Sequence, residues 1–109
     1  MAVYIANAFS LGMLPETGAD LRVRPVDPVA FLAQDPEGGQ VESVVGHADT
    51  ARLFSNLLGR EVAFNRATLR LSQGDRVLVG QYRGPRLPEG ATELPEGAAV
   101  LWYLVEVVA

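Results

Sequence analysis

An almost unbroken apolar run, Val100 to Val108, sets the strictest limit on the fold of this chain. A strand with one face in water alternates between apolar and polar residues, whereas a strand covered on both faces is apolar throughout. The run therefore predicts a strand in the centre of a β-sheet, buried on both of its faces.

Shorter patterns upstream predict the other strands. They cover Ala2 to Ala6, Leu21 to Arg24, Asn65 to Leu71, and Arg76 to Tyr82. In the third of these segments, Ala67, Leu69 and Leu71 alternate with polar residues and are expected on one face. The turn sequence Gln73-Gly74-Asp75 joins the last two segments, which are expected to pair as a β-hairpin.

Two segments carry helix signals. Asp27-Pro28 places a hydrogen-bond acceptor at an N-cap and a proline at the first helical position, which predicts a short helix. From about Ala48 to Leu58 the apolar residues recur with helical spacing, and Asp49 near the start suits the helix dipole. Gly59 is placed to cap the end of this second helix.

Together these elements predict an α/β fold, with one compact domain over residues 1–109 and a mixed β-sheet flanked by helices. A chain of 109 residues supports a single hydrophobic core of modest size. Residues 41–45 fit either a strand or a helical turn, and the pattern leaves both open. Loops are expected at residues 35–39 and from Arg83 to Gly97, and loops as long as the second one are usually functional or mobile.

Composition excludes several kinds of site. The chain has no cysteine and one histidine, which argues against disulfides, thiolate catalysis and zinc. Magnesium held by carboxylates is the alternative, but no closely spaced set of Asp and Glu supports it, so neither a metal nor a cofactor is expected. No apolar run approaches the roughly 18 residues of a membrane helix, and the N-terminus lacks the features of a signal peptide. A cytoplasmic protein is therefore expected. The net charge of −4 disfavours long nucleic acids, but nine arginines leave room for a local pocket that binds a small anionic ligand.

Gly46-His47 directly precedes the helix expected from Ala48. Free N–H groups and the positive end of the helix dipole favour a phosphate at such a position. His47 has two interpretations there. It is either a structural residue that caps the turn or sits exposed, or a general acid that becomes charged when a phosphorylated ligand binds.

Other polar residues also have two interpretations each. Arg66 opens a predicted strand, and Arg83 and Arg86 lie in the long loop. Each arginine is either a phosphate ligand or a solvated surface residue, and Glu89 is spaced to pair with Arg86. Two further residues, in the loop after the first strand, either hydrogen-bond a ribose or close a turn: Asn7 and Ser10.

Five segments, taken together, resemble the viral type III anti-CRISPR ring nucleases and related host ring nucleases. They are Tyr4-Ile5-Ala6-Asn7-Ala8-Phe9-Ser10, Gly46-His47-Ala48-Asp49-Thr50-Ala51, Asn65-Arg66, Gln81, and Arg86-Leu87-Pro88-Glu89-Gly90. The resemblance implies a C2 homodimer with an α/β fold that binds cyclic tetra-adenylate across its two-fold axis. It also implies metal-independent cleavage into short linear adenylates with 2′,3′-cyclic phosphate ends, which would shut down type III CRISPR signalling.

The same resemblance implies a role for each site residue. His47 is the general acid that protonates the departing 5′ oxygen while a ribose 2′-hydroxyl attacks the neighbouring phosphorus. Glu89 is the second residue of the implied catalytic site, where it orders Arg86 or its loop. The other implied roles are phosphate binding by Arg66 and Arg86, and positioning of ribose or base by Asn7, Ser10 and Gln81. The loop from Arg83 to Gly97 would close over the ring and exclude water.

Two departures from the family pattern leave points open. Gly12 stands where relatives often carry asparagine, so one polar ligand contact is lost. The loop before Arg86 is one residue longer, so either Arg83 or Arg86 makes the main phosphate contact, and Arg86 is favoured.

Two other functions stay as alternatives. One is a module that sequesters the cyclic adenylate or another nucleotide without cutting it. The other is a DNA- or RNA-binding accessory protein, which the net negative charge of the chain disfavours.

Overall fold

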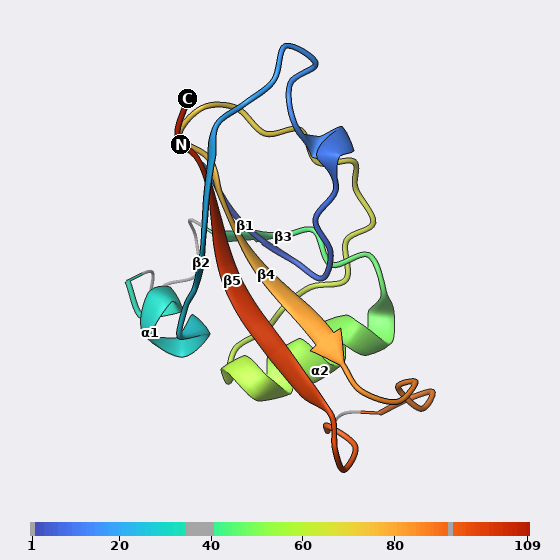
Figure 1. The fold of residues 1–109 in the computed structure, drawn as a ribbon. Helices are drawn as coiled ribbons and strands as arrows, with labels where there is room; N and C mark the ends of the chain where they lie inside the picture. Colours follow the sequence, from blue (N-terminus) through green and yellow to red (C-terminus); the bar gives the residue numbers. More distant parts are fainter. Residues whose placement is uncertain (1, 35–40, 92) are drawn as a thin grey trace.

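The computed structural model describes residues 2–34, 41–91 and 93–109 and contains a five-stranded mixed β-sheet with the order β2-β5-β4-β1-β3 (Figure 1). The strands are β1 Val3–Ala6, β2 Leu21–Pro25, β3 Val41–Ser43, β4 Arg76–Arg83 and β5 Ala99–Val107. β3, β1 and β4 run parallel, and β5 is antiparallel to both β4 and β2. The predicted α/β fold with a mixed sheet is therefore confirmed.

The helices begin and end where local signals place them. In α1, Pro28–Leu32, the Asp27 carboxylate accepts a hydrogen bond from the N–H of Val29 at 3.0 Å. α2, Ala48–Leu58, ends at Gly59, whose left-handed φ of 66° is a conformation that glycine adopts without steric cost. A short 3-10 helix, η1, spans Leu11–Met13.

The sheet is covered differently on its two faces. Both helices pack on one face, where they form a first core with the residues Ile5, Leu32, Val45, Ala51, Phe54, Leu58, Val62 and Leu78. The other face is covered by irregular chain, which forms a second core with Ala6, Leu69, Leu71, Val77, Val79, Val105 and Val107. The helices thus flank the sheet from one side only, and this leaves the carboxyl ends of the parallel strands close to the start of α2 (Figure 1).

The apolar run near the C-terminus is an interior strand, as predicted. β5 lies between β2 and β4, and Leu104 and Val105, which point to opposite faces, are both buried. The middle strand of the five is β4, however, and the first half of β5 is only half-buried.

The predicted hairpin between residues 65–71 and 76–82 is wrong. Residues 65–71 form no strand, and β4 pairs with β1 on one side and β5 on the other, so neither edge of β4 is left for a hairpin partner. Leu69 and Leu71 are buried in the second core, but Ala67 is exposed. The alternating pattern therefore reflects packing against the sheet rather than pairing within it.

The structure also defines two segments whose form or bounds the sequence pattern left open or placed differently. Residues 41–43 form β3, and Val45 makes an isolated parallel bridge to Phe64, so the segment left open as strand or turn is extended. Arg83 belongs to β4, so the long connection to β5 spans residues 84–98. The loop expected at residues 35–39 lies outside the described part of the chain.

Gly80 of β4 lies beneath the ring contact that holds α2 on the sheet. The rings of Phe54 and Trp102 meet with centroids 4.8 Å apart. A Cβ on Gly80 would lie 2.6 Å from Cζ3 of Trp102 and 2.7 Å from Cζ of Phe54. Phe54 is fully buried and Trp102 is half-buried against it, so the Phe54 ring in particular has little room to shift.

We therefore expect Gly80→Ala to lower the free energy of unfolding by about 1–3 kcal/mol, as overpacking of a filled core typically does. Urea unfolding followed by the fluorescence of Trp102, the single tryptophan, measures this. Gly12→Ala is the matched control, because its Cβ would meet only the Ser10 hydroxyl, at 3.7 Å. Equal stability of the two variants would contradict the packing argument.

Candidate functional site

The carboxyl ends of three parallel strands meet at one edge of the sheet. Asn7 directly follows β1, His47 lies shortly after β3, and Gln81 is near the end of β4. In open α/β sheets, ligands bind in the crevice outside this edge. Residues predicted from separate parts of the sequence are therefore brought to the edge where such a fold places its ligand.

Asn7, Gly46 and Arg66 form a compact group at this edge. The Gly46 N–H donates a hydrogen bond to Oδ1 of Asn7 at 3.4 Å. A Cβ on Gly46 would lie 3.8 Å from Cγ of Arg66, so the arginine stem runs alongside the glycine backbone. The N–H of Asn65 donates to the carbonyl of Val45 at 2.9 Å and holds Arg66 in this place.

His47 is the N-cap residue of α2. Its carbonyl accepts the first helical hydrogen bond, from Ala51 N–H at 3.0 Å, but its imidazole makes no capping hydrogen bond and is exposed. The first N–H groups of the helix have no acceptor within it and favour an anion. Of the two structural interpretations, capping by the side chain is therefore wrong, and the exposed imidazole lies at a helix start whose free N–H groups favour an anion.

A pocket of about 260 Å³ opens next to this group. It is lined by Asn7, Ala8, Phe9, Val79 and Gln81. The amide side chains of Asn7 and Gln81 offer donors and acceptors above apolar walls, a combination that suits a planar heterocycle. Ser10 follows Phe9 directly and is exposed, and its hydroxyl makes no capping bond to η1.

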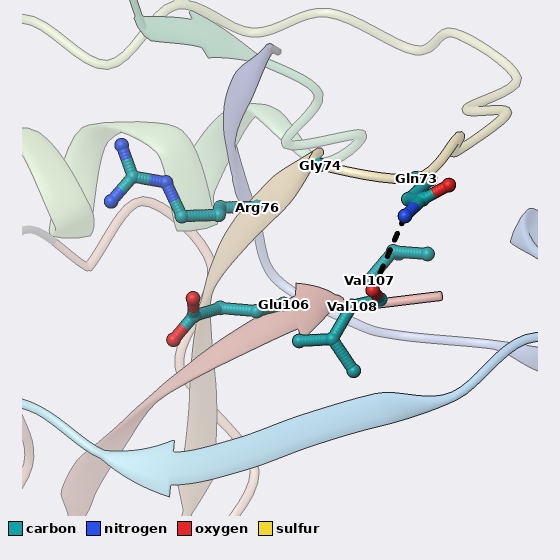
Figure 2. Close-up of a pocket in the computed structure, with 6 residues that line it drawn as sticks. All are labelled: Gln73, Gly74, Arg76, Glu106, Val107 and Val108. Carbon is teal, nitrogen blue, oxygen red and sulfur yellow. Dashed lines mark hydrogen bonds between the residues drawn. The ribbon is translucent and has the colours of Figure 1, made fainter.

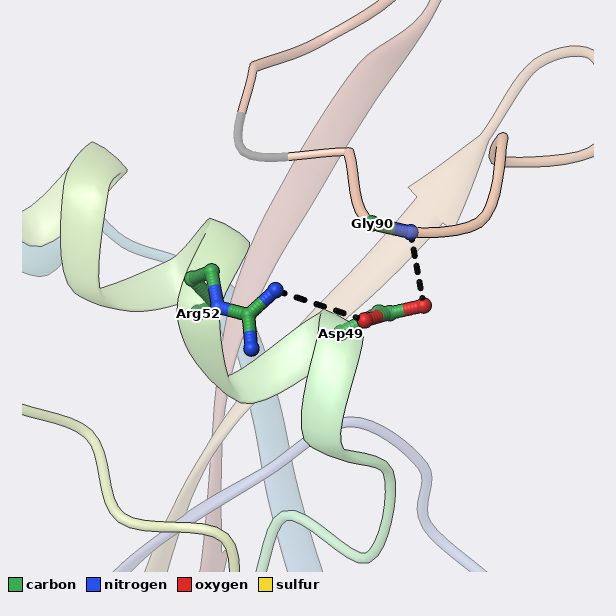
Figure 3. Close-up of polar contacts among 3 residues, drawn as sticks. All are labelled: Asp49, Arg52 and Gly90. Atoms are coloured by element: carbon green, nitrogen blue, oxygen red, sulfur yellow. Dashed lines mark hydrogen bonds and ion pairs between the residues drawn. The ribbon is translucent and has the colours of Figure 1, made fainter.

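The connection between β4 and β5 carries the remaining predicted residues. Arg83, Arg86 and Glu89 are exposed, and within the described residues no ion pair joins Arg86 to Glu89. Their predicted pairing is therefore not formed, in keeping with the small gain from ion pairs in water. The N–H of Gly90 instead donates to Oδ2 of Asp49 at 3.0 Å, which fastens the connection to the first turn of α2 (Figure 3).

Sequence reasoning missed two parts of this site. Asp49 was expected only to complement the helix dipole, and nothing in the local sequence marks a contact that spans 41 residues. Phe9 and Val79, which wall the pocket, read as ordinary apolar residues of a loop and a strand. Their shared position depends on sheet pairing, which the local pattern does not contain.

A second pocket, of about 430 Å³, lies at the opposite end of β4 (Figure 2). It is lined by Gln73, Gly74, Arg76, Glu106, Val107 and Val108. The guanidinium of Arg76 lies over the ring of Phe31 at 5.2 Å, and the Glu106 carboxylate points along the same face from the neighbouring strand (Figure 2). Arg76 and Glu106 contribute opposite charges to its wall, so this larger pocket favours an anionic ligand less than a purely basic wall would.

Within the described residues, no three His, Asp or Glu side chains lie close enough together to hold a metal ion. In the same parts of the chain, no helix is both long enough and apolar enough to cross a lipid bilayer.

The fold and the site define a small α/β protein with a five-stranded mixed sheet and a polar site at its carboxyl edge. The model of the STIV B116-like family matches residues 3–98, and the chain belongs to this family. The structure is similar to B116 of Sulfolobus turreted icosahedral virus, with a TM-score of 0.81 and 26% sequence identity over 97% of this chain and 99% of that one. The comparison with curated proteins gives no match.

Proposed function

We propose that this protein is a metal-independent ring nuclease that binds cyclic tetra-adenylate at the interface of a homodimer and cuts it, thereby shutting down type III CRISPR signalling. The observation that carries the proposal is the exposed imidazole of His47 at the start of α2, beside Asn7 and Arg66. Membership of a family that includes a virus protein and the five ring-nuclease-like segments support the same conclusion.

The proposed reaction uses the RNA's own nucleophile. A ribose 2′-hydroxyl attacks the adjacent phosphorus and loses its proton to water, and the bond from phosphorus to the 5′ oxygen breaks. His47, as imidazolium, gives its proton to that departing oxygen. The products are short linear adenylates with 2′,3′-cyclic phosphate ends. This chemistry requires neither a protein nucleophile nor a metal, in keeping with a chain that has no cysteine.

The other residues bind the ring in this proposal. Arg66 and Arg86 contact phosphates, because a guanidinium matches phosphate geometry with two parallel hydrogen bonds. Arg83 is the other candidate for the contact assigned to Arg86. Glu89 orders the connection that carries Arg86. Ribose and base are positioned by three residues near the pocket: Asn7, Ser10 and Gln81.

A symmetric dimer explains how one histidine per chain serves a ring of four nucleotides. Two copies related by a two-fold axis place two His47 side chains on opposite sides of a ligand that has the same symmetry. The connection of each copy, residues 84–98, closes over the ring. A cytoplasmic site of action, where the messenger is made, belongs to the same proposal.

Incubation of the protein with cyclic tetra-adenylate in EDTA tests the proposal. We expect the ring to be converted into linear adenylates whose masses include a cyclic phosphate, at the rate seen without EDTA. Recovery of intact ring bound to the protein would instead assign a sequestering module. Loss of turnover in EDTA, restored by added Mg²⁺, would contradict the metal-independent mechanism.

A further inference from the structure

The connection from β4 to β5 contains a turn whose central N–H makes no hydrogen bond within the turn. The N–H of Ala91 donates to the carbonyl of Pro88 at 3.1 Å, and Gly90 has a φ of 77°. A β-turn with positive φ at its third residue is type II, and glycine is the residue that accepts this conformation. The central peptide of such a turn, here between Glu89 and Gly90, makes no hydrogen bond within the turn. Its N–H is therefore free to donate to water or to an acceptor elsewhere in the molecule.

Asp49 supplies that acceptor. Its Oδ2 accepts from the Gly90 N–H at 3.0 Å, and its Oδ1 lies 3.7 Å from Nη1 of Arg52 (Figure 3). The Asp49 side chain is 22% exposed, whereas that of Arg52 is 56% exposed. A hydrogen bond from a backbone N–H to a carboxylate is about twice as strong as one between neutral groups. The first turn of a helix also stabilises the negative charge.

This hydrogen bond joins the two halves of the proposed site. Asp49 lies two residues after His47, and the bonded N–H belongs to the peptide that follows Glu89. Two other hydrogen bonds of the connection, from the Tyr82 hydroxyl to the Pro85 carbonyl and from the Ala98 N–H to the Pro95 carbonyl, are local and do not reach α2. The hydrogen bond through Asp49 therefore links the peptide after Glu89 to the helix turn that follows His47.

We propose that Asp49 is a positioning residue that holds the β4–β5 connection against the start of α2. Arg86 and Glu89, which this connection carries, are then placed near His47 before the ligand binds. This inference rests on the proposed ring-nuclease function. A connection held in place before binding loses less conformational freedom when the ligand arrives. Asp49 is thus expected to act on substrate binding more than on the chemical step.

The test compares Asp49→Ala with Arg52→Ala, which removes the ion pair but leaves the acceptor of Gly90 intact. We expect Asp49→Ala to speed hydrogen exchange of the Gly90 amide, measured by NMR, by about 10- to 100-fold. We also expect it to raise KM for cyclic tetra-adenylate about tenfold, with kcat changed less than about threefold. Arg52→Ala should leave both measurements close to the wild type. Asp49→Asn, which keeps a carbonyl oxygen at the same place, should restore most of the protection of Gly90.

Three outcomes overturn the inference. If wild-type protein turns over the ring and Asp49→Ala matches Arg52→Ala in Gly90 exchange and in KM, Asp49 does not position the connection. If Asp49→Ala lowers kcat and leaves KM unchanged, the residue acts on the chemical step instead. A wild-type protein that leaves the ring intact would overturn the proposed function, and the positioning role with it.

Discussion

Replacing His47 with alanine is expected to slow the cleavage of cyclic tetra-adenylate by about 10²–10⁴-fold, the usual effect of removing a positioned general acid. Without the imidazolium, the 5′ oxygen departs as an alkoxide that takes its proton from water. The exposed imidazole makes no capping hydrogen bond to α2, so the helix itself should be little disturbed. Single-turnover cleavage, with enzyme in excess over the ring, measures the chemical step directly.

His47→Gln serves as the matched variant for this test. Glutamine keeps a polar side chain with N–H donors but carries no proton that it can give up at neutral pH. We expect it to be as slow as His47→Ala, while both variants bind the ring nearly as tightly as the wild type. Cleavage by His47→Gln at more than about half of the wild-type rate would show that hydrogen bonding, and not proton transfer, is the contribution of His47.

The parts of the fold that the sequence predicted well are those with local signals. α2 occupies residues 48–58 as expected, because its apolar spacing, the acidic residue in its first turn and Gly59 all lie within one short segment. Asp27 and Pro28 define the start of α1 in the same way. The C-terminal strand was also predicted, because continuous apolar character requires cover on both faces.

The incorrect hairpin shows that a local sequence pattern does not predict strand pairing. An alternating pattern reports which side chains are buried, but it does not report which backbone supplies the hydrogen bonds. Residues 65–71 alternate because Leu69 and Leu71 insert into the second core, whereas β4 takes its partners from β1 and β5. β1 and β4 are far apart in sequence, so their pairing depends on the whole sheet.

For the candidate site, too, the local features were predicted and the long-range contacts were not. The residue types were predicted from the sequence, and the structure places Asn7 and Arg66 next to Gly46, which directly precedes His47. Their meeting point depends on three parallel strands ending at one edge, which requires the sheet order. The hydrogen bond from Gly90 to Asp49 depends on the path of a loop, and no local sequence pattern predicts it. Specific contacts of this kind are what the structure adds.

Phe54 is the largest fully buried side chain of α2. Its side chain is fully buried, at 0% exposure, in the first core, and its ring contacts that of Trp102 on β5. Gly80 lies beneath both rings and has no side chain that could fill the gap. A cavity at this position would therefore collapse only in part, and its energetic penalty would persist.

We expect Phe54→Ala to lower the free energy of unfolding by about 3–5 kcal/mol, as in other fully buried phenylalanine truncations. Small domains are stable by about 5–15 kcal/mol in total, so this variant should unfold at a clearly lower urea concentration and temperature. Phe64→Ala is the matched control, since the same atoms are removed from a side chain that is 55% exposed. That variant should lose less than about 1 kcal/mol. Equal losses in the two variants would mean that α2 is held by other contacts, and the start of the helix, with His47, would then depend on them instead.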